Sequence, residues 1–466
     1  MPKYKLSYYI IVADTPDATG KKILYSSRSG KGKIVSSLCY DFLINQRFDE
    51  IPKSTLDQFI EAKFIVPNHE DELDTVIKEN ENSSRGSGSM LYEVIQPSAM
   101  CQLGCYYCGQ DHVRHSIQEG LYKNLIKRIE AKIEAGNYNH LFIGWFGAEP
   151  LLALPQIKEL TRLFKTLTAK HGMEYSCKMV TNGVGMKPNI YKLLVEELSV
   201  TKIEVTLDGL AEYHDQHRYT KNGKGSFDII YKNLEYAVNS KWSKRCPISI
   251  RCNVDIRNEK GVSGLIKKLS DDGLHKKIAY FYPIGIYSWG GNDAQEESLT
   301  KEEYAKKEIA WFKEKHNADY PSGSILPKRN KIVCMSVTDT ADMYDAYGNV
   351  FSCSEVSYSP VYKDKYLFNG KLARPESITS ERPLTTWYKD VQKGEVQCQG
   401  CKIFPVCGGA CPKSWKEGIP ACPSMKFNLK QRMQLSYIFN KADTGEIKNE
   451  LDTFIKQLDL SQMCPV

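Results

Sequence analysis

No stretch of the 466-residue chain approaches the roughly 20 consecutive apolar residues that a membrane-spanning helix needs. The first residues also lack the layout of a signal peptide, because Asp14 follows the apolar run Leu6–Ala13 at once and no small-residue cleavage site is evident. Arginine-rich runs and aromatic-basic repeats are missing too, so nothing supports nucleic-acid binding. We therefore expect a cytoplasmic protein with no membrane and no nucleic acid among its partners.

Long low-complexity tracts are also absent, and a composition of 41% hydrophobic and 26% charged residues is typical of a globular protein. The net charge of +7 is small for a surface of this size, so it permits acidic partners without indicating one. A chain this long exceeds one ordinary hydrophobic core, which favours two or three domains. The 15 cysteines, an odd number without an export signal, favour thiols that serve metals rather than disulfides.

Three of these cysteines lie close together in Cys101-Gln-Leu-Gly-Cys105-Tyr-Tyr-Cys108, a C-x3-C-x2-C spacing. Iron–sulfur clusters are normally held by four cysteine thiolates, so a loop with three leaves one iron open to a small chelating molecule. The alternative is a zinc site, which His112 or His115 just downstream could complete.

This loop closely resembles the cysteine loop of the radical S-adenosylmethionine (SAM) enzymes. The resemblance implies a [4Fe–4S] cluster whose open iron binds SAM through its amino and carboxylate groups. An electron from the reduced cluster then frees a 5′-deoxyadenosyl radical. Tyr107, the aromatic residue before the last cysteine, is by the same resemblance a contact of the cofactor.

From about residue 91 to residue 320, apolar strands alternate with amphipathic helices. We predict one helix that Ser116 opens with a capping box and Gly136 ends, and a second from about Gln156. Six β–α units favour an α/β fold, a parallel sheet closed into a partial (β/α)6 barrel. The cysteine loop follows the first strand, at the rim where such barrels carry their active sites. The predicted strands are Leu91–Gln96, His140–Phe146, Ser176–Thr181, Lys202–Leu207, Ile248–Asp255 and Ile278–Ile284.

Two further segments at this rim resemble SAM-binding elements of the family. After the second strand comes Gly147-Ala-Glu-Pro150, close to a Gly-Gly-Glu-Pro element that takes up the SAM ammonium. The resemblance assigns that role to Gly147, Ala148 and Glu149, with Ala148 in place of the second glycine. After the fourth strand it assigns the SAM carboxylate to Thr206 and Arg218. The plainer interpretations are a tight turn and a surface pair of Arg218 with Asp215.

On the fifth predicted strand, polar residues alternate with apolar ones, which puts Ser249, Arg251 and Asn253 on one face. If that face is the lumen of the barrel, Arg251 contacts SAM or the substrate. A strand that is half exposed to solvent is an equally good interpretation.

Residues 1–78 form a predicted independent module with strands Tyr4–Val12 and Lys22–Ser26, helices Ser37–Asn45 and Ser54–Lys63, and a closing strand at Phe64–Val66. This layout resembles the winged-helix, leader-peptide recognition domains found ahead of many peptide-modifying radical SAM enzymes. A structural extension that covers the barrel is the alternative. Residues 79–90, rich in Ser and Gly, predict a flexible linker between the module and the barrel domain, 91–320.

The cysteines return in residues 330–430, ahead of a predicted C-terminal helical extension at 431–466. Their register, C…G-x4-C…C-x2-C-x5-C-x3-C…C, resembles the SPASM domain of radical SAM peptide maturases, with a zinc ribbon as the alternative. The resemblance implies two auxiliary clusters. One is held by Cys398, Cys401, Cys407 and Cys422, and the other by Cys334, Cys353 and Cys411.

The second of these sets departs from the family pattern. Some relatives carry a fourth ligand where this chain has Lys328, so the cluster has either an open iron or a ligand among the unassigned cysteines. These are Cys39, Cys177, Cys246, Cys252 and Cys464. In the sulfatase maturases an acid directly after the second cysteine acts as a base. Here Ser354 stands in that place, and Glu355, one residue on, is either a catalytic base or a solvated surface residue.

These resemblances imply an enzyme that modifies a small, ribosomally made precursor peptide with a leader segment. Its cofactors are three [4Fe–4S] clusters and SAM, and its electron donor is a flavodoxin or ferredoxin. An open auxiliary iron favours a thioether cross-link, with carbon–carbon cross-links or epimerisation as alternatives. The rival functions are an anaerobic sulfatase maturase that makes formylglycine and a non-catalytic iron–sulfur or zinc protein that binds a peptide.

Overall fold

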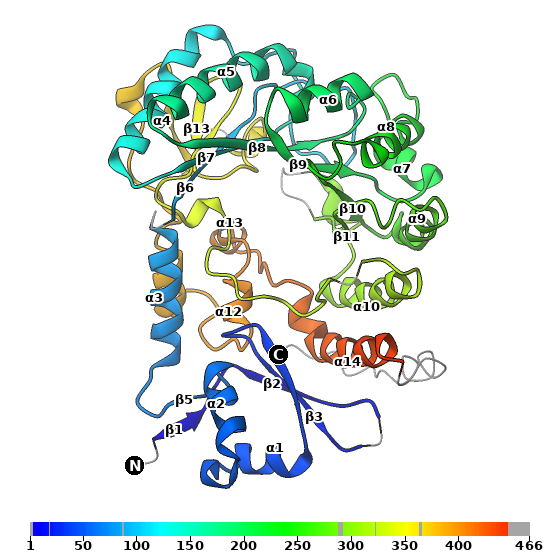
Figure 1. Cartoon of the computed structure of the whole chain (residues 1–466). Coiled ribbons are helices and arrows are strands. Elements are labelled where there is room, and N and C mark those ends of the chain that lie inside the picture. The colour runs from blue at the N-terminus through cyan, green and yellow to red at the C-terminus, as the bar shows by residue number, and fades with distance from the viewer. Residues whose placement is uncertain are drawn as a thin grey trace.

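The computed structural model describes residues 3–17, 19–85, 88–287, 292–321, 323–362 and 366–445. In Figure 1 the chain forms a small N-terminal module, a large α/β barrel domain at the opposite end, and a cysteine-rich segment between them. None of the helices in these ranges is long and apolar enough to cross a membrane.

The N-terminal module is an α+β unit, as its sequence pattern predicts. The predicted first strand is divided into two, because β1 pairs antiparallel with β5 while β2 joins β3 and β4 in a separate antiparallel sheet. Apolar residues of both helices pack against the sheet, with Leu43 of α1 and Phe59 of α2 fully buried. Its elements are β1 Tyr4–Leu6, β2 Ile10–Asp14, β3 Lys22–Ser26, β4 Lys31–Val35, α1 Ser37–Ile44, α2 Lys53–Glu61 and β5 Ile65–Pro67.

The first half of the expected linker, residues 79–84, is helical in the structure. Helix α3 runs from Glu72 to Ser84, and in Figure 1 it spans the distance from the module to the barrel. Asp71 caps its first turn, and Asn80 is fully buried where it accepts a hydrogen bond from Arg329 at 2.6 Å. These tertiary contacts stabilise a segment whose polar composition alone predicts disorder. Residues 86–87 lie outside the described residues.

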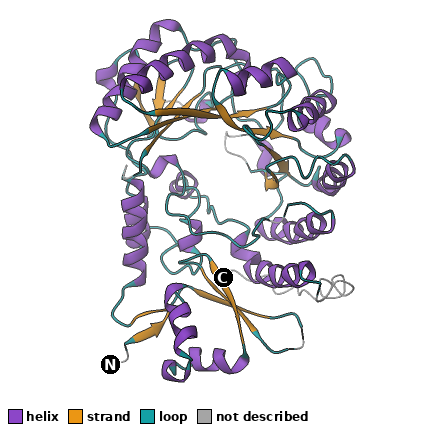
Figure 2. Ribbon diagram, in the orientation of Figure 1, coloured by secondary structure: helices purple, strands orange, loops and turns teal. Residues whose placement is uncertain are grey.

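Six parallel strands form the centre of the barrel domain in chain order, β6 to β11, as the sequence predicts. Figure 2 shows the helices outside the curved sheet. Leu125, Ile129 and Ile133 of α4 are buried in the main core, which matches the predicted apolar stripe. The strands are β6 Met90–Ile95, β7 His140–Trp145, β8 Glu174–Thr181, β9 Val200–Thr206, β10 Ile248–Val254 and β11 Tyr280–Gly285.

The first barrel helix begins later than predicted. Ser116 forms an isolated bridge with Ser98 instead of a capping box, and α4 starts only at Tyr122. Gly136 ends it as expected. The helices of the barrel domain are α4 Tyr122–Ala135, α5 Leu154–Lys170, α6 Pro188–Glu196, α7 Ala211–His217, α8 Phe227–Asn239, α9 Glu259–Asp271 and α10 Lys301–Asn317.

The cysteine-rich segment extends the same sheet. Strand β12 pairs parallel with β6, and the hairpin partner β13 leads directly to Cys353. The segment's elements are β12 Met343–Tyr344, β13 Asn349–Phe351, β14 Phe368–Lys371, α11 Trp387–Gln392, α12 Phe404–Cys407, α13 Pro412–Lys416 and α14 Met425–Asp443. Helix α14 supplies part of the predicted C-terminal extension, whose residues 446–466 lie outside the described ranges.

Candidate functional site: three groups of cysteines

The first group of cysteines lies on the loop after β6, at the carboxyl edge of the barrel sheet. A bridge between Leu103 and Thr220 and a hydrogen bond from Gly104 N to Tyr219 O, 2.9 Å, fasten this loop to the loop after α7. Burial, with the charges of Cys108 and Cys101 and against that of Arg218, raises the pKa of the Cys105 thiol to about 12. The three thiols are therefore close neighbours that keep their protons unless a cation binds them.

Gly147 brings the loop after β7 against the first strand. Its φ is +109°, and a Cβ at this position would lie 2.8 Å from the Cβ of Gln96, so only glycine fits. Glu149 is fully buried and accepts hydrogen bonds from Thr181 Oγ1 at 2.7 Å and from the backbone N–H groups of Leu151 and Asn182. The Glu149 carboxylate therefore links the loops after β7 and β8, and burial and this negative charge both raise the pKa of the Cys101 thiol. Ala148 is partly buried beside it.

Arg218 is buried in a network beneath the cysteine loop rather than paired with Asp215. Its NH1 group donates to Tyr107 Oη, and Tyr107 donates in turn to Asp208 at 2.7 Å. Asn253 Nδ2 donates to the same Tyr107 oxygen at 3.0 Å. Asp215 instead accepts from the backbone of the α8 N-terminus. Among the described residues, the buried Nε–H of Arg218 has no hydrogen-bond partner, which fits a group that awaits an anionic ligand.

Two other predicted contacts lie on the strands beside this network. Thr206 is the buried last residue of β9, in register with Arg251 of β10. Arg251 Nε donates to Asn253 Oδ1 at 2.8 Å, so Arg251 and Asn253 share the side of the strand that faces Tyr107. Arg251 and Asn253 of β10 therefore lie on the side of the strand that faces the site.

The second group comprises Cys398, Cys401, Cys407 and Cys422. All four line one small cavity together with apolar side chains that include Phe404 and Trp415. Burial raises the pKa of the Cys398 thiol to about 12, and the charges of the other three cysteines act in the same direction. Four thiols around one cavity are the donor set of a complete iron–sulfur cluster.

The third group is Cys334, Cys353 and Cys411. Burial raises the pKa of Cys353 to about 12, with further contributions from Glu355, Cys334 and Cys411. Cys411 is exposed. Besides desolvation, the charges of Cys411 and Glu355 raise the pKa of Tyr287 and the charge of Arg251 lowers it, so these three groups lie near one another. This group thus lies close to the polar side of β10.

No other described cysteine joins this third group. Cys39 packs in the N-terminal module, and Cys177, Cys246 and Cys252 are buried in the barrel core. Cys464 lies outside the described residues. Lys328 packs against the turn at Gly30 of the module, where a glycine Cβ would lie 3.2 Å from its Cα.

Glu355 is exposed to solvent, as the surface alternative predicts, although neighbouring protein still acts on its carboxyl. Desolvation raises the pKa of its carboxyl above the usual value, and the charge of Arg251 and a hydrogen bond from Ser354 oppose the shift. Gln96 at the end of the first strand ties this segment to the barrel, because its side chain donates to Ser354 O at 2.8 Å and accepts from Ser357.

The sulfur atoms of each cysteine group are spread more widely than a single zinc ion requires. In a tetrahedral zinc site the sulfurs lie roughly 3.8 Å apart, given zinc–sulfur bonds of about 2.3 Å. Across the described ranges, one group of three or more potential ligands falls within 4.8 Å, and it is Glu130, Glu134 and His171 on the outer helices. Among the described residues, no three cysteine sulfurs all lie within 4.8 Å of one another, which favours a metal group larger than one zinc ion. His112 Nε2 lies 3.7 Å from Cys108 Sγ, whereas His115 stacks on Tyr347.

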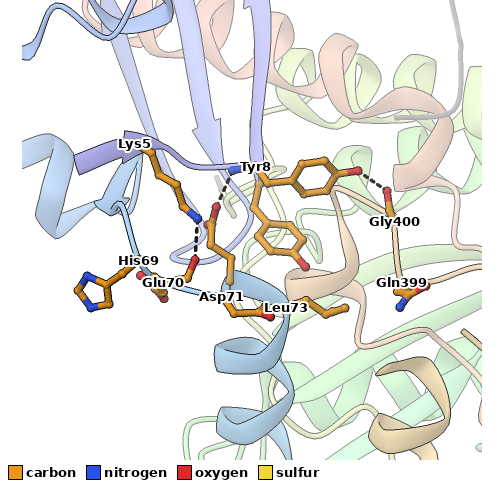
Figure 3. A pocket seen from close by; sticks show the side chains of 10 residues that line it. Lys5, Tyr8, His69, Glu70, Asp71, Leu73, Gln399 and Gly400 are labelled. Carbon is orange, nitrogen blue, oxygen red and sulfur yellow. Dashed lines mark hydrogen bonds between the residues drawn. The ribbon is translucent and has the colours of Figure 1, made fainter. Parts of the chain in front are cut away.

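A separate cavity of about 500 Å³ lies between the module and the turn that carries Cys398 and Cys401. In Figure 3, Tyr8 of the module reaches toward Gly400, to whose carbonyl oxygen its Oη donates at 2.6 Å, while the Lys5 ammonium donates to Glu70 O at 2.6 Å. The Glu72 carboxylate on the wall of this cavity already accepts hydrogen bonds from the Ser7 hydroxyl and from Tyr8 N. The cavity marks the junction of module and cysteine-rich segment, while the unusual chemistry lies at the three cysteine groups.

The sequence interpretation missed several residues of the site. Asn182 directly follows β8 and Asp208 lies two residues after the end of β9, and Asn182 Nδ2 lies 3.7 Å from Cys101 Sγ. Their position at the carboxyl ends of strands is a signal that could have identified them. His214, which accepts from Asp208 N at 3.0 Å, carries no such signal in the sequence.

Comparisons with known proteins agree with this geometry. Residues 95–251 match the family model of the radical SAM superfamily. A cysteine-type anaerobic sulfatase-maturating enzyme of Clostridium novyi is 22% identical over 386 residues, which is 75% of this chain and 97% of that protein. The radical SAM cyclopropyl synthase TigE of Paramaledivibacter caminithermalis is 24% identical over 213 residues, and this match covers 42% of the chain but only 43% of TigE.

Among solved structures, native anSMEcpe with bound AdoMet and the Cp18Cys peptide has a TM-score of 0.54 at 18% identity, covering 80% of this chain and 100% of that one. This likeness extends the shared fold beyond the matched superfamily segment. The chain contains a radical SAM domain over residues 95–251, set in a mixed α/β fold with a mostly parallel sheet.

Proposed function

We propose that this protein is a radical SAM maturase that modifies a ribosomally synthesised precursor peptide and holds three [4Fe–4S] clusters. The loop cysteines 101, 105 and 108 hold the cluster that binds SAM. Cysteines 398, 401, 407 and 422 hold an outer auxiliary cluster, and cysteines 334, 353 and 411 hold an inner one. The observation that carries the proposal is the separation of ten thiols into groups of three, four and three, none compact enough for a single ion.

The residues around the first group fit SAM. When bound, SAM at the reduced cluster supplies a 5′-deoxyadenosyl radical that removes a hydrogen atom from a carbon of the peptide. Arg218 offers an unpaired Nε–H to the SAM carboxylate, and Tyr107 and Asp208 hold the guanidinium in place. Gly147, Ala148, Glu149, Thr206 and Arg251 form the remaining contacts. The barrel wall excludes water that would intercept a reactive species.

The third cysteine group supports a substrate cysteine as the point of attachment. With three thiols, this cluster has an iron open to a ligand, and a soft thiolate suits it. Cys411 is exposed beside Arg251 and Glu355, where a peptide can approach. This favours a thioether between a peptide cysteine and another residue over a carbon–carbon cross-link, with Glu355 as the base.

The other partners follow from the same domain plan. The module at residues 1–78 recognises the leader segment of the precursor, and a flavodoxin or ferredoxin supplies electrons. The solved relative with a bound Cp18Cys peptide supports a peptide substrate. Contacts of Tyr8 and Ser27 with the backbone at Gly400 and Lys402 hold the module against the cysteine-rich segment.

The test is anaerobic incubation of the reconstituted, reduced protein with SAM, followed by co-expression with a short cysteine-bearing peptide encoded beside the gene. We expect 5′-deoxyadenosine well above the level of a Cys105→Ala variant, and a peptide that loses two hydrogen atoms. Absence of 5′-deoxyadenosine would instead indicate a non-catalytic metal protein that binds a peptide.

Sulfatase maturation is the second candidate, because the Clostridium novyi relative matches over 97% of its own length. Two features of this chain oppose it: the N-terminal module, and Ser354 where the maturases carry an acid. Conversion of a cysteine-bearing sulfatase peptide to formylglycine would favour this candidate over the cross-linking one.

A further inference from the structure

The three cysteine groups differ in the charge of the groups that contact their sulfur atoms. At the first group the hydrogen bonds to Cys101 Sγ come from neutral groups, Leu103 N at 3.5 Å and Asn182 Nδ2 at 3.7 Å. The charge of the buried Arg218 also acts on all three cysteines of this group. Beside Cys108 the contact is an imidazole nitrogen, His112 Nε2, at 3.7 Å from the sulfur. At the third group, Cys334 accepts hydrogen bonds from the backbone and hydroxyl of Ser336.

The outer group is different because a cation contacts it. Lys426 Nζ lies 3.6 Å from Cys422 Sγ, and the same side chain lines the cavity that the four thiols share. Its charge also acts on Cys398 and Cys401. In the described part of the chain, the Lys426–Cys422 contact is the one hydrogen bond between a charged side chain and a sulfur of the ten cysteines.

A second ammonium group lies close by. Lys301, at the start of α10, donates to Pro420 O, two residues before Cys422, and its charge interacts with those of Cys422 and Cys407. Lys426 is itself the second residue of α14, so the positive N-terminal end of that helix begins close to Cys422. Apolar Phe404, Trp415 and Ile403 line part of the cavity and lower its polarity. In such surroundings a charge interacts more strongly than it does in water.

We propose that Lys426, assisted by Lys301, raises the reduction potential of the outer auxiliary cluster above that of the inner one. The physical reason is that reduction adds a negative charge to the cluster, and hydrogen bonds and cations at the sulfurs stabilise that charge. The outer cluster is then the more readily reduced of the auxiliary pair, so an electron on the inner cluster passes to it. This inference rests on the cluster assignment of the proposed function.

The experiment is a reductive titration of the full-length, anaerobically reconstituted protein, followed by electron paramagnetic resonance. The variants are Lys426→Gln and Lys301→Gln. Lys430→Gln is the matched control, since Lys430 lies one turn further along α14 and is exposed. A variant without cysteines 334, 353 and 411 identifies the signal of the outer cluster.

We expect Lys426→Gln to shift the midpoint potential of the outer cluster to a more negative value and to leave the other two clusters unchanged. Lys301→Gln gives a smaller shift in the same direction, and Lys430→Gln gives none. Unchanged outer-cluster potentials in Lys426→Gln, with iron retained, would overturn the inference. If Lys426→Gln loses iron, Lys301→Gln decides, because that residue touches no sulfur atom. A wild-type protein with iron for fewer than three clusters would contradict the proposed function itself.

Discussion

At the scale of single residues, the position of Arg218 depends on neighbours that do not themselves meet a ligand. His214 accepts the N–H of Asp208 through Nδ1, so its proton resides on Nε2, which contacts Ser226 at 3.0 Å. Ser226 donates in turn to the backbone carbonyl of Arg218 at 2.6 Å. One neutral imidazole therefore fixes both the carboxylate and the backbone that hold the guanidinium.

Replacement of Arg218 tests the role of the guanidinium. Arg218→Lys keeps the charge but loses the fork and the Nε–H, so we expect the Kd for SAM to rise by about tenfold or more, or roughly 1.4 kcal/mol. Equilibrium dialysis on reconstituted protein measures it. Arg245→Lys, at an exposed position, is the control and should bind SAM as the wild type does. Equal affinities in the two variants would remove Arg218 from the binding site.

His214 predicts a pH dependence. Burial lowers the pKa of His214 well below the ordinary value of about 6.5. Below about pH 6.5 the imidazole is therefore protonated in the unfolded chain but still neutral in the folded chain. The stability that neutral His214 contributes is thus fully present above about pH 6.5 and is lost as the pH falls below it. His214→Asn keeps an acceptor for Asp208 N–H but does not titrate. Its denaturation midpoint should fall less than that of the wild type between about pH 7.5 and 5.5, and an equal fall would refute this account.

At the scale of elements, a buried charge network joins the cysteine-rich segment to the barrel. Lys132 of α4 contacts Glu93 of β6 and, at 2.8 Å, Asp342 just before β12. Arg128 and Arg382 also pair with Asp342, and these cations hold the pKa of its carboxyl at about 2 against the effect of burial. The network fixes β12 beside β6, and through the β12–β13 hairpin it fixes Cys353.

Gly348 makes that hairpin possible. Its φ is +76°, and a Cβ there would lie 2.9 Å from Leu121, so any other residue strains the turn that aims the chain at Cys353. The glycine of the SPASM-like register therefore has a physical role in placing a cysteine.

Removal of Lys132 should be costly. Lys132→Met leaves two buried carboxylates without their shared cation, and we expect a loss of about 3–5 kcal/mol in the free energy of unfolding. Chemical denaturation measures this loss. Lys127→Met, on the exposed face of the same helix, is the control and should cost under about 0.5 kcal/mol. Similar stabilities for the two variants would show that the network is not important for folding.

The six barrel strands were predictable to within about two residues, because each is a short apolar run whose pattern does not depend on distant contacts. The failures have tertiary causes. Ser116 has a good capping sequence but pairs with Ser98 instead, and residues 79–84 have the composition of a linker but pack as part of α3. Likewise, spacing alone cannot show that Cys411 leaves Cys407 for Cys353. That arrangement came from the family resemblance, and it accords with the electrostatic neighbours of Cys353.

At the scale of the whole molecule, the cysteine-rich segment lies between the module and the barrel (Figure 1). It contacts both, through Tyr8 and Gly400 on one side and Gln96 and Ser354 on the other. The inner group lies near Arg251 of the barrel, and the outer group lies on the turn that contacts the module through Gly400.

The most direct test of this account is the iron content of single-cysteine variants, measured after anaerobic reconstitution. Three cubes predict about twelve irons per wild-type chain. The decisive pair is Cys411→Ala and Cys407→Ala, which are close in sequence but belong to different groups. We predict that each loses about four irons and that Cys411→Ala abolishes the signal of the inner cluster while Cys407→Ala abolishes that of the outer one. Loss of the same signal in both variants, or zinc in place of iron, would contradict the account.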